Sequence, residues 1–252
     1  MHGRAILYLS LAMSIVSSAA PSQPLGRLRG KVLSDRNEPM ATEVRIEALS
    51  GPRGEEYVGQ RSYRILSNAK GEWALLGFKA GTWMFASAPE GLVPDAVVLP
   101  INVFVPAGAG LEGTAPSWQP VLKPSSAPSG ELGKWLSDAA AAGRAGNKAQ
   151  VTQTLSLVPA DADAKALAAA GRVCLLARDA GLARALFTRA LERDPSSFRA
   201  QLGLGSTAMM VSDFSAAGKA FKAARDLTTD KDERTYLTAA IADLSRMDIS
   251  GH

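Results

Sequence analysis

The first half of the chain alternates between apolar and polar residues. In GRLRGKVLSD, Leu28 and Val32 alternate with arginines and a lysine, and in ATEVRIEALS, Val44 and Ile46 alternate with charged residues. A period of two is typical of antiparallel strands with one buried face. Segments rich in Gly, Pro, Asn and Asp separate the runs. About six or seven such strands, at a spacing of about ten residues, predict a small β-sandwich.

The second half is rich in Ala, Leu and Arg at helical spacing. One set of residues recurs in it at a fixed period of 34 residues, the separation of Gly171 and Gly205. The aligned pairs are Gly171 and Gly205, Asp179 and Asp213, Ala183 and Ala217, Phe187 and Phe221, and Ala190 and Ala224. Small residues let two helices cross closely, and a phenylalanine fills the gap between one unit and the next. The pattern predicts stacked helical hairpins, with a plain helical bundle as the alternative.

The same register extends less clearly in both directions. One further period back, Leu136 and Ala149 suit their positions, but Gln153 stands where a phenylalanine is expected. We therefore interpret residues 131–161 as a degenerate first unit and residues 231–247 as a terminal capping helix. Three units with a cap is about the minimum for a stable solenoid.

Both halves resemble known families. GRLRGKVLSDRNEPMATEVRIEAL and SNAKGEWALLGFKAGTWMFASAPEGLVP, in this order, resemble the carboxypeptidase regulatory-like domain, a transthyretin-like sandwich. The helical register resembles the tetratricopeptide repeat (TPR). These resemblances imply two domains: an all-β, Ig- or transthyretin-like sandwich over residues 21–122 and an all-α, TPR-like solenoid over residues 131–252. The first family is non-catalytic, which implies a supporting or adhesive role for the sandwich.

Two further segments complete the predicted organisation. Residues 123–130, with two prolines and three serines, have the composition of a linker. Residues 1–20 have the parts of a signal peptide, namely Arg4, an apolar stretch and then small residues. We therefore expect export to the periplasm or the outside of the cell, with no membrane span after cleavage; an uncleaved anchor is the alternative. The single cysteine, Cys174, allows no disulfide within the chain.

Composition restricts the chemistry. The net charge is only +4, and 28 Lys and Arg are interleaved with 24 Asp and Glu, which is not the pattern of a nucleic-acid-binding surface. The two histidines are His2 and the last residue, His252, so the chain between them offers no imidazole for a catalytic triad or a zinc site. We expect no enzyme activity, no metal and no cofactor; an enzyme that uses a carboxylate pair brought together by the fold is the alternative.

The TPR resemblance implies where a partner would bind. In that family the first helix of each unit lines a concave groove, which places Lys165 and Arg172 there in one unit, and Arg199, Ser206 and Met209 in the next. Three cations beside apolar neighbours suit a peptide with an acidic residue or a free carboxylate. The alternative is that these are ordinary exposed charges. The asparagines of the carboxylate-gripping TPR subset are absent, so that specialised role is not carried over.

The sequence therefore predicts an exported, non-catalytic scaffold that binds a protein or peptide partner in the helical groove. An accessory subunit of an envelope complex is the same hypothesis with a fixed partner. The alternative function is carbohydrate or cell-wall binding through the sandwich, with Trp73 or Trp83 stacked on a sugar. Their positions in the strand pattern favour a place in the core or at its rim.

Overall fold

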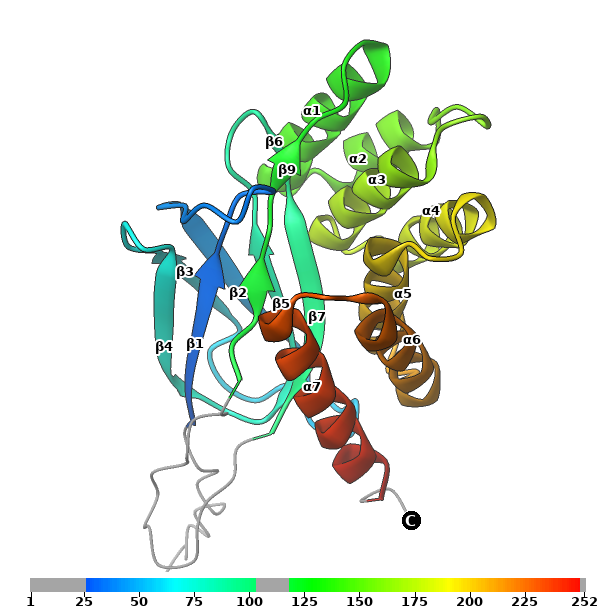
Figure 1. The fold of residues 1–252 in the computed structure, drawn as a ribbon. Coiled ribbons are helices and arrows are strands. Elements are labelled where there is room, and N and C mark those ends of the chain that lie inside the picture. The colour runs from blue at the N-terminus through cyan, green and yellow to red at the C-terminus, as the bar shows by residue number, and fades with distance from the viewer. Residues whose placement is uncertain (1–25, 103–117, 250–252) are drawn as a thin grey trace, which may run out of the picture.

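The alternating first half of the chain forms a β-sandwich (Figure 1). The computed structural model describes residues 26–102 and 118–249, so the predicted signal peptide lies outside the described residues. The strands are β1 (Gly26–Val32), β2 (Glu43–Ser50), β3 (Ser62–Leu66), β4 (Glu72–Phe78), β5 (Gly81–Ser87), β6 (Leu92–Val93), β7 (Asp95–Ile101), β8 (Val121–Leu122) and β9 (Ser125–Ser126).

The strands form two sheets and one short pair. One sheet has the order β4-β1-β8, with β8 parallel to β1, and the other has the antiparallel order β3-β2-β5-β7. Strands β6 and β9 pair with each other. Leu28, Val32, Val44 and Ile46 are buried, while the charged residues that alternate with them are wholly or partly exposed. The predicted β-sandwich is confirmed.

Strands β5 and β7 lack the alternation of the other strands because both of their faces are covered. Every residue of both strands is buried. One face lies inside the sandwich and the other lies under the helices, of which α3, α5 and α7 contact β7. A strand buried on both faces carries a continuous apolar run, such as AVVLPI after Asp95.

The second half forms helical hairpins in the predicted register. The helices are α1 (Glu131–Arg144), α2 (Lys148–Leu155), α3 (Ala164–Leu176), α4 (Ala180–Arg193), α5 (Phe198–Met210), α6 (Phe214–Leu227) and α7 (Lys231–Ile249). Both bounds of α5 and α6 lie one full period after those of α3 and α4. Asp179 and Asp213 cap α4 and α6, and the preceding residues, Arg178 and Ser212, both have a φ of 58°. The repeat therefore extends to the turns.

Phe187 fills the gap between the two repeat units, as predicted. Its side chain is fully buried. A Cβ atom added to Gly171 of the same unit would lie 2.6 Å from the ring, and one added to Gly203 of the next unit would lie 2.2 Å from it. Glycine at both positions lets the ring enter between α3 and α5.

The first unit departs from the expected register by two positions. Gly146 has a φ of 74° and directly precedes the cap of α2, so it corresponds to Arg178, which precedes the cap of α4. These two residues are two positions closer together in the sequence than one repeat period. Ala149 is consequently exposed, and Val151 and Leu155 take the buried positions. The expectation for Ala149 was wrong because this change of spacing shifts the inward face of α2.

The sandwich and the helices share their hydrophobic cores. Met209, Phe221 and Tyr236 from the helices belong to the same buried cluster as Trp83 and Val98 from the strands. The segment predicted as a linker contains β9, so it is part of this packed structure. Within the described ranges, no helix combines the length and apolar character needed to cross a bilayer.

Helix α7 carries a buried carboxylate near the end of β7. Asp243 is 6% exposed, forms an ion pair with Arg246 over 3.1 Å, and accepts the backbone N–H of Asn102. Burial raises the pKa of Asp243 to about 6, although Arg246 and the backbone N–H favour the charged form.

Substitution of two helical glycines should change stability in opposite directions. Gly203→Ala places a methyl group against the Phe187 ring and should lower the free energy of unfolding by about 1–3 kcal/mol. Gly218→Ala in α6 meets nothing within 4 Å and should raise it by about 0.5–1 kcal/mol through lower backbone entropy in the unfolded chain. Urea unfolding of both variants tests this, and equal changes would contradict the wedge role of Phe187.

Asp243 should make the protein less stable as the pH rises from about 4 to about 6. Its pKa is 3.8 in the unfolded reference and about 6 in the folded protein, so the folded state binds the proton more tightly in this window. Asp243→Asn should remove this contribution and stabilise the protein at neutral pH by about 2 kcal/mol. Unfolding measured at several pH values tests the difference in stability between the two proteins, which should vanish only below the unfolded pKa of 3.8.

Candidate functional site

The concave surface of the helical hairpins is occupied by the chain's own sandwich. We call the surface lined by α3 and α5 the groove. Helices α3 and α5 both contact β7. Of the residues predicted to line the groove, Arg172, Ser206 and Met209 are buried, Arg199 is partly buried and Lys165 is exposed. The Ser206 hydroxyl accepts the Val98 N–H over 3.1 Å. Strand β7 is the edge of its sheet, so this bond satisfies a backbone group that no neighbouring strand can reach.

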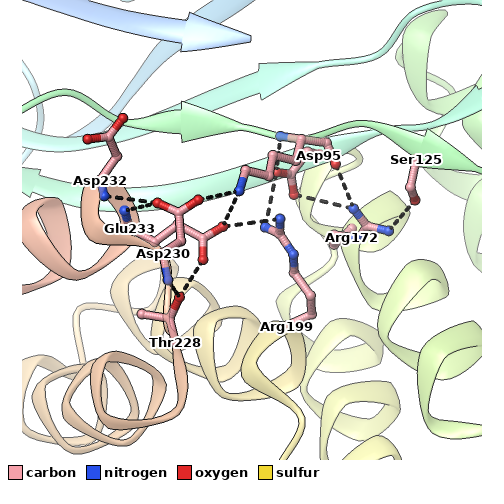
Figure 2. Close-up of polar contacts among 9 residues, drawn as sticks. Asp95, Ser125, Arg172, Arg199, Thr228, Asp230, Asp232 and Glu233 are labelled. Carbon is pink, nitrogen blue, oxygen red and sulfur yellow. Dashed lines mark hydrogen bonds and ion pairs between the residues drawn. The ribbon is translucent and has the colours of Figure 1, made fainter. Parts of the chain in front are cut away.

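Asp95, at the start of β7, lies between the two arginines of the groove (Figure 2). Arg172 Nη1 lies 3.5 Å from Asp95 Oδ1, and Arg199 Nη1 lies 3.3 Å from Oδ2. The backbone N–H of Lys123 donates to Oδ2 over 2.6 Å. Asp95 is 3% exposed, so these donors replace the water that a carboxylate would otherwise need.

The network continues to the start of α7. Lys123 Nζ lies 2.7 Å from Asp230 Oδ2 and 3.3 Å from Glu233 Oε1. Arg199 Nη2 lies 3.4 Å from the same Glu233 oxygen, and the Thr228 hydroxyl donates to Oε2 over 2.7 Å. Asp230 also caps α7 by accepting the N–H groups of residues 232 and 233. The network therefore fixes α7 against α5 and the segment after β8.

Charges balance within this groove network, which comprises Asp95, Lys123, Arg172, Arg199, Asp230 and Glu233. Burial lowers the pKa of Arg172, and Asp95 opposes that shift. Burial also lowers the pKa of Arg199, but Asp95 and Glu233 outweigh it and the net shift is upward. The Tyr236 hydroxyl beside the network is buried, which raises its pKa well above the usual value. Each carboxylate pairs with a cation, so the network holds the packed elements in place.

A cleft of about 400 Å³ opens beside the network. Its lining is Asp35, Asn37, Lys123, Ser125, Ala164, Lys165, Ala168, Arg172, Asp194, Ser197, Phe198, Arg199 and Glu233. The first residues of α3 and α5 both border it, and such ends carry partial positive charge. Lys165 is exposed there and forms no ion pair among the residues that the structure describes. In the same part of the chain, no group of three or more His, Cys, Asp or Glu is placed to hold a metal.

The structure brings four of the five predicted site residues against the sandwich. Arg172 and Arg199 hold Asp95, Ser206 holds the strand backbone, and Met209 packs in the shared core. The fifth residue, Lys165, lines the cleft of about 400 Å³. Binding of a partner by these residues stays a prediction.

Sequence reasoning missed Asp95, Lys123 and Glu233. A lone acid before the apolar run AVVLPI was the available signal for Asp95. No sequence signal marked Lys123 as a site residue, because its proline- and serine-rich surroundings have the composition of a linker.

No family model matches the chain, and no curated protein matches it. Among solved structures, the TPR domain of Sgt2 from Aspergillus fumigatus is similar at 20% identity, with a TM-score of 0.39, over 49% of this chain and 82% of that domain. The 3-chlorocatechol 1,2-dioxygenase of Rhodococcus opacus 1CP is similar at 8% identity and a TM-score of 0.32, over 42% of this chain and 61% of the enzyme. Chlorocatechol 1,2-dioxygenase of Pseudomonas putida is similar at 10% identity and a TM-score of 0.30, over 40% and 60%.

None of these similarities carries a functional conclusion for this chain. The identity of the sandwich as a carboxypeptidase regulatory-like domain stays a prediction. The described residues form a β-sandwich followed by TPR-like helical hairpins.

Removal of the Asp95 charge should strongly destabilise the protein. Asp95→Asn leaves Arg172 and Arg199 without their shared carboxylate and should cost about 3–5 kcal/mol. Asp232→Asn is the matched control, because Asp232 is 58% exposed and pairs with Lys31 over 3.8 Å; it should cost less than about 1 kcal/mol. Chemical unfolding measures both, and similar small losses would show that the groove network contributes little.

Proposed function

We propose that the protein is an exported, non-catalytic interaction protein that binds an extended, acidic segment of a protein partner. Export rests on the composition of residues 1–20. The binding proposal rests on one observation: the groove already holds an extended strand of this chain, with Asp95 between Arg172 and Arg199.

The open cleft continues the groove beyond Asp95. It offers the exposed Lys165, the half-buried Phe198 and the starts of two helices. An exposed cation beside an aromatic ring suits an acidic residue flanked by an apolar one. A partner segment would therefore bind in the cleft without displacing β7, on a surface that the shared core keeps rigid.

The observed packing sets the form of the binding experiment. Helices expressed without the sandwich would expose Leu202, Met209 and Tyr236, which are buried in the whole chain. Such a fragment would bind apolar surfaces without specificity. The bait for partner capture should therefore be the full chain after removal of residues 1–20.

Charge reversal at the cleft should weaken partner capture. Lys165→Glu places an acid at the proposed contact and should weaken binding about tenfold or more, because a favourable charge pair becomes a repulsive one. Lys219→Glu, at an exposed position of α6, is the control and should retain the partner. Capture from envelope extract, quantified for both baits at two salt concentrations, tests this; equal capture by both would remove the cleft as the binding surface.

The carbohydrate alternative has no aromatic platform at the two tryptophans on which it depends. Trp83 is 1% exposed, packs edge to face with Tyr57 and Phe78, and donates its Nε1–H to the Lys79 carbonyl. Trp73 is 4% exposed and stacks on Phe85. Stacking on a sugar requires a free ring face, which neither tryptophan presents.

A further inference from the structure

A second cleft, separate from the groove network, is surrounded by arginines. It has a volume of about 160 Å³ and lies where the outer face of the β3-β2-β5-β7 sheet meets α1 and the end of α3. Its lining is Glu43, Arg45, Arg64, Ala86, Ala88, Arg144 and Leu176. We call it the arginine cleft. It shares no residue with the groove network or with the larger cleft.

Two of its arginines stand directly opposite each other in the sheet. Arg45 of β2 pairs with Arg64 of β3 in the antiparallel register. Like charges at such positions repel, because their Cβ atoms are only about 5 Å apart. On its other side Arg45 faces Ala86 of β5, and Ala88 follows. The small side chains leave open the space that the two guanidinium groups border.

Arg144 of α1 brings a third guanidinium group to the cleft. Its hydrogen bond to the Pro89 carbonyl oxygen is a long one, 3.4 Å from Nη1. No carboxylate within the described ranges forms an ion pair with it. A neutral carbonyl at this distance does not balance a guanidinium charge.

The carboxylates near the cleft are too few to balance its arginines. Glu47 is shared, because Arg45 lies 3.0 Å from it and Arg178 binds its other oxygen. Glu43 pairs with Arg64 over 3.5 Å. Four arginines, counting Arg144, thus face two glutamates, which leaves an excess of two positive charges at one small cleft.

We propose that the arginine cleft binds a dianionic oxyanion, a phosphate or sulfate group, held by Arg45, Arg64 and Arg144. Planar guanidinium groups match tetrahedral oxyanions through paired hydrogen bonds. A dianion neutralises the two excess charges and relieves the Arg45–Arg64 repulsion. The volume of about 160 Å³ holds such a group with a few waters, each of which occupies about 30 Å³.

Calorimetric titration of the full chain tests the site directly. At slightly alkaline pH, inorganic phosphate and sulfate should bind, while chloride and acetate at equal ionic strength should not. Glycerol 3-phosphate distinguishes a free anion from a group carried on a larger molecule: it should bind more weakly than phosphate in the first case and at least as well in the second. Absence of heat with phosphate, sulfate and glycerol 3-phosphate would overturn the proposal.

Arginine variants assign the binding to this cleft. Arg64→Gln and Arg144→Gln should each weaken phosphate binding about tenfold, since each removes one charge-assisted contact. Arg27→Gln is the control, because Arg27 is an exposed strand arginine away from the cleft. An equal loss in all three variants would mean that the anion responds only to overall charge, which contradicts the proposal.

A carboxylate introduced by substitution provides a further test, which is read from thermal stability. Ala88→Glu places an acid in the cleft, and Ala88→Gln places a neutral side chain of the same size there. The Glu variant should have the higher melting temperature at low salt, and phosphate should raise the melting temperature of the Gln variant but not that of the Glu variant. A Gln variant as stable as the Glu variant in the absence of anions would show that the cleft does not favour negative charge.

Discussion

The Asp95 carboxylate is the point on which the arrangement of both halves depends. It is buried and held by arginines 77 and 104 residues further along the chain. An unpaired carboxylate in this place would be too costly, and so would the two arginines without it. The contact therefore admits one placement of β7 against α3 and α5. Lys123 and Glu233 extend the same constraint to α7.

This constraint changes what the helical hairpins can do. An open solenoid presents its concave surface to partners. Here the sandwich packs against that surface and shares a hydrophobic core with the helices. The surfaces that remain open include the larger cleft beside the groove network and the arginine cleft. The sandwich thus contributes to the larger cleft, because Asp35, Lys123 and Ser125 border it beside residues of α3 and α5.

The sequence predicted what depends on local spacing. Leu28 and Val32 marked strand faces, and Phe187 and Phe221 marked a helical repeat whose register is confirmed by both hairpins. It did not predict which surface covers the groove, because Asp95 and Arg172 meet only through tertiary packing. Nor did the sequence predict that Ala149 is exposed. The repeat register changes by two positions before α2, and this change does not alter the amino-acid composition of the helix.

The position of β7 at the edge of its sheet has a consequence for synthesis. The ribosome completes β7 before any of the helices that cover it, since α3 begins at Ala164 and α7 at Lys231. Until then the nascent chain carries an apolar strand with an unpaired edge, the kind of template on which chains associate. The Ser206 hydroxyl that accepts the Val98 N–H is made more than 100 residues later. A cell that makes this protein must therefore prevent the incompletely folded sheet from associating with other chains during synthesis.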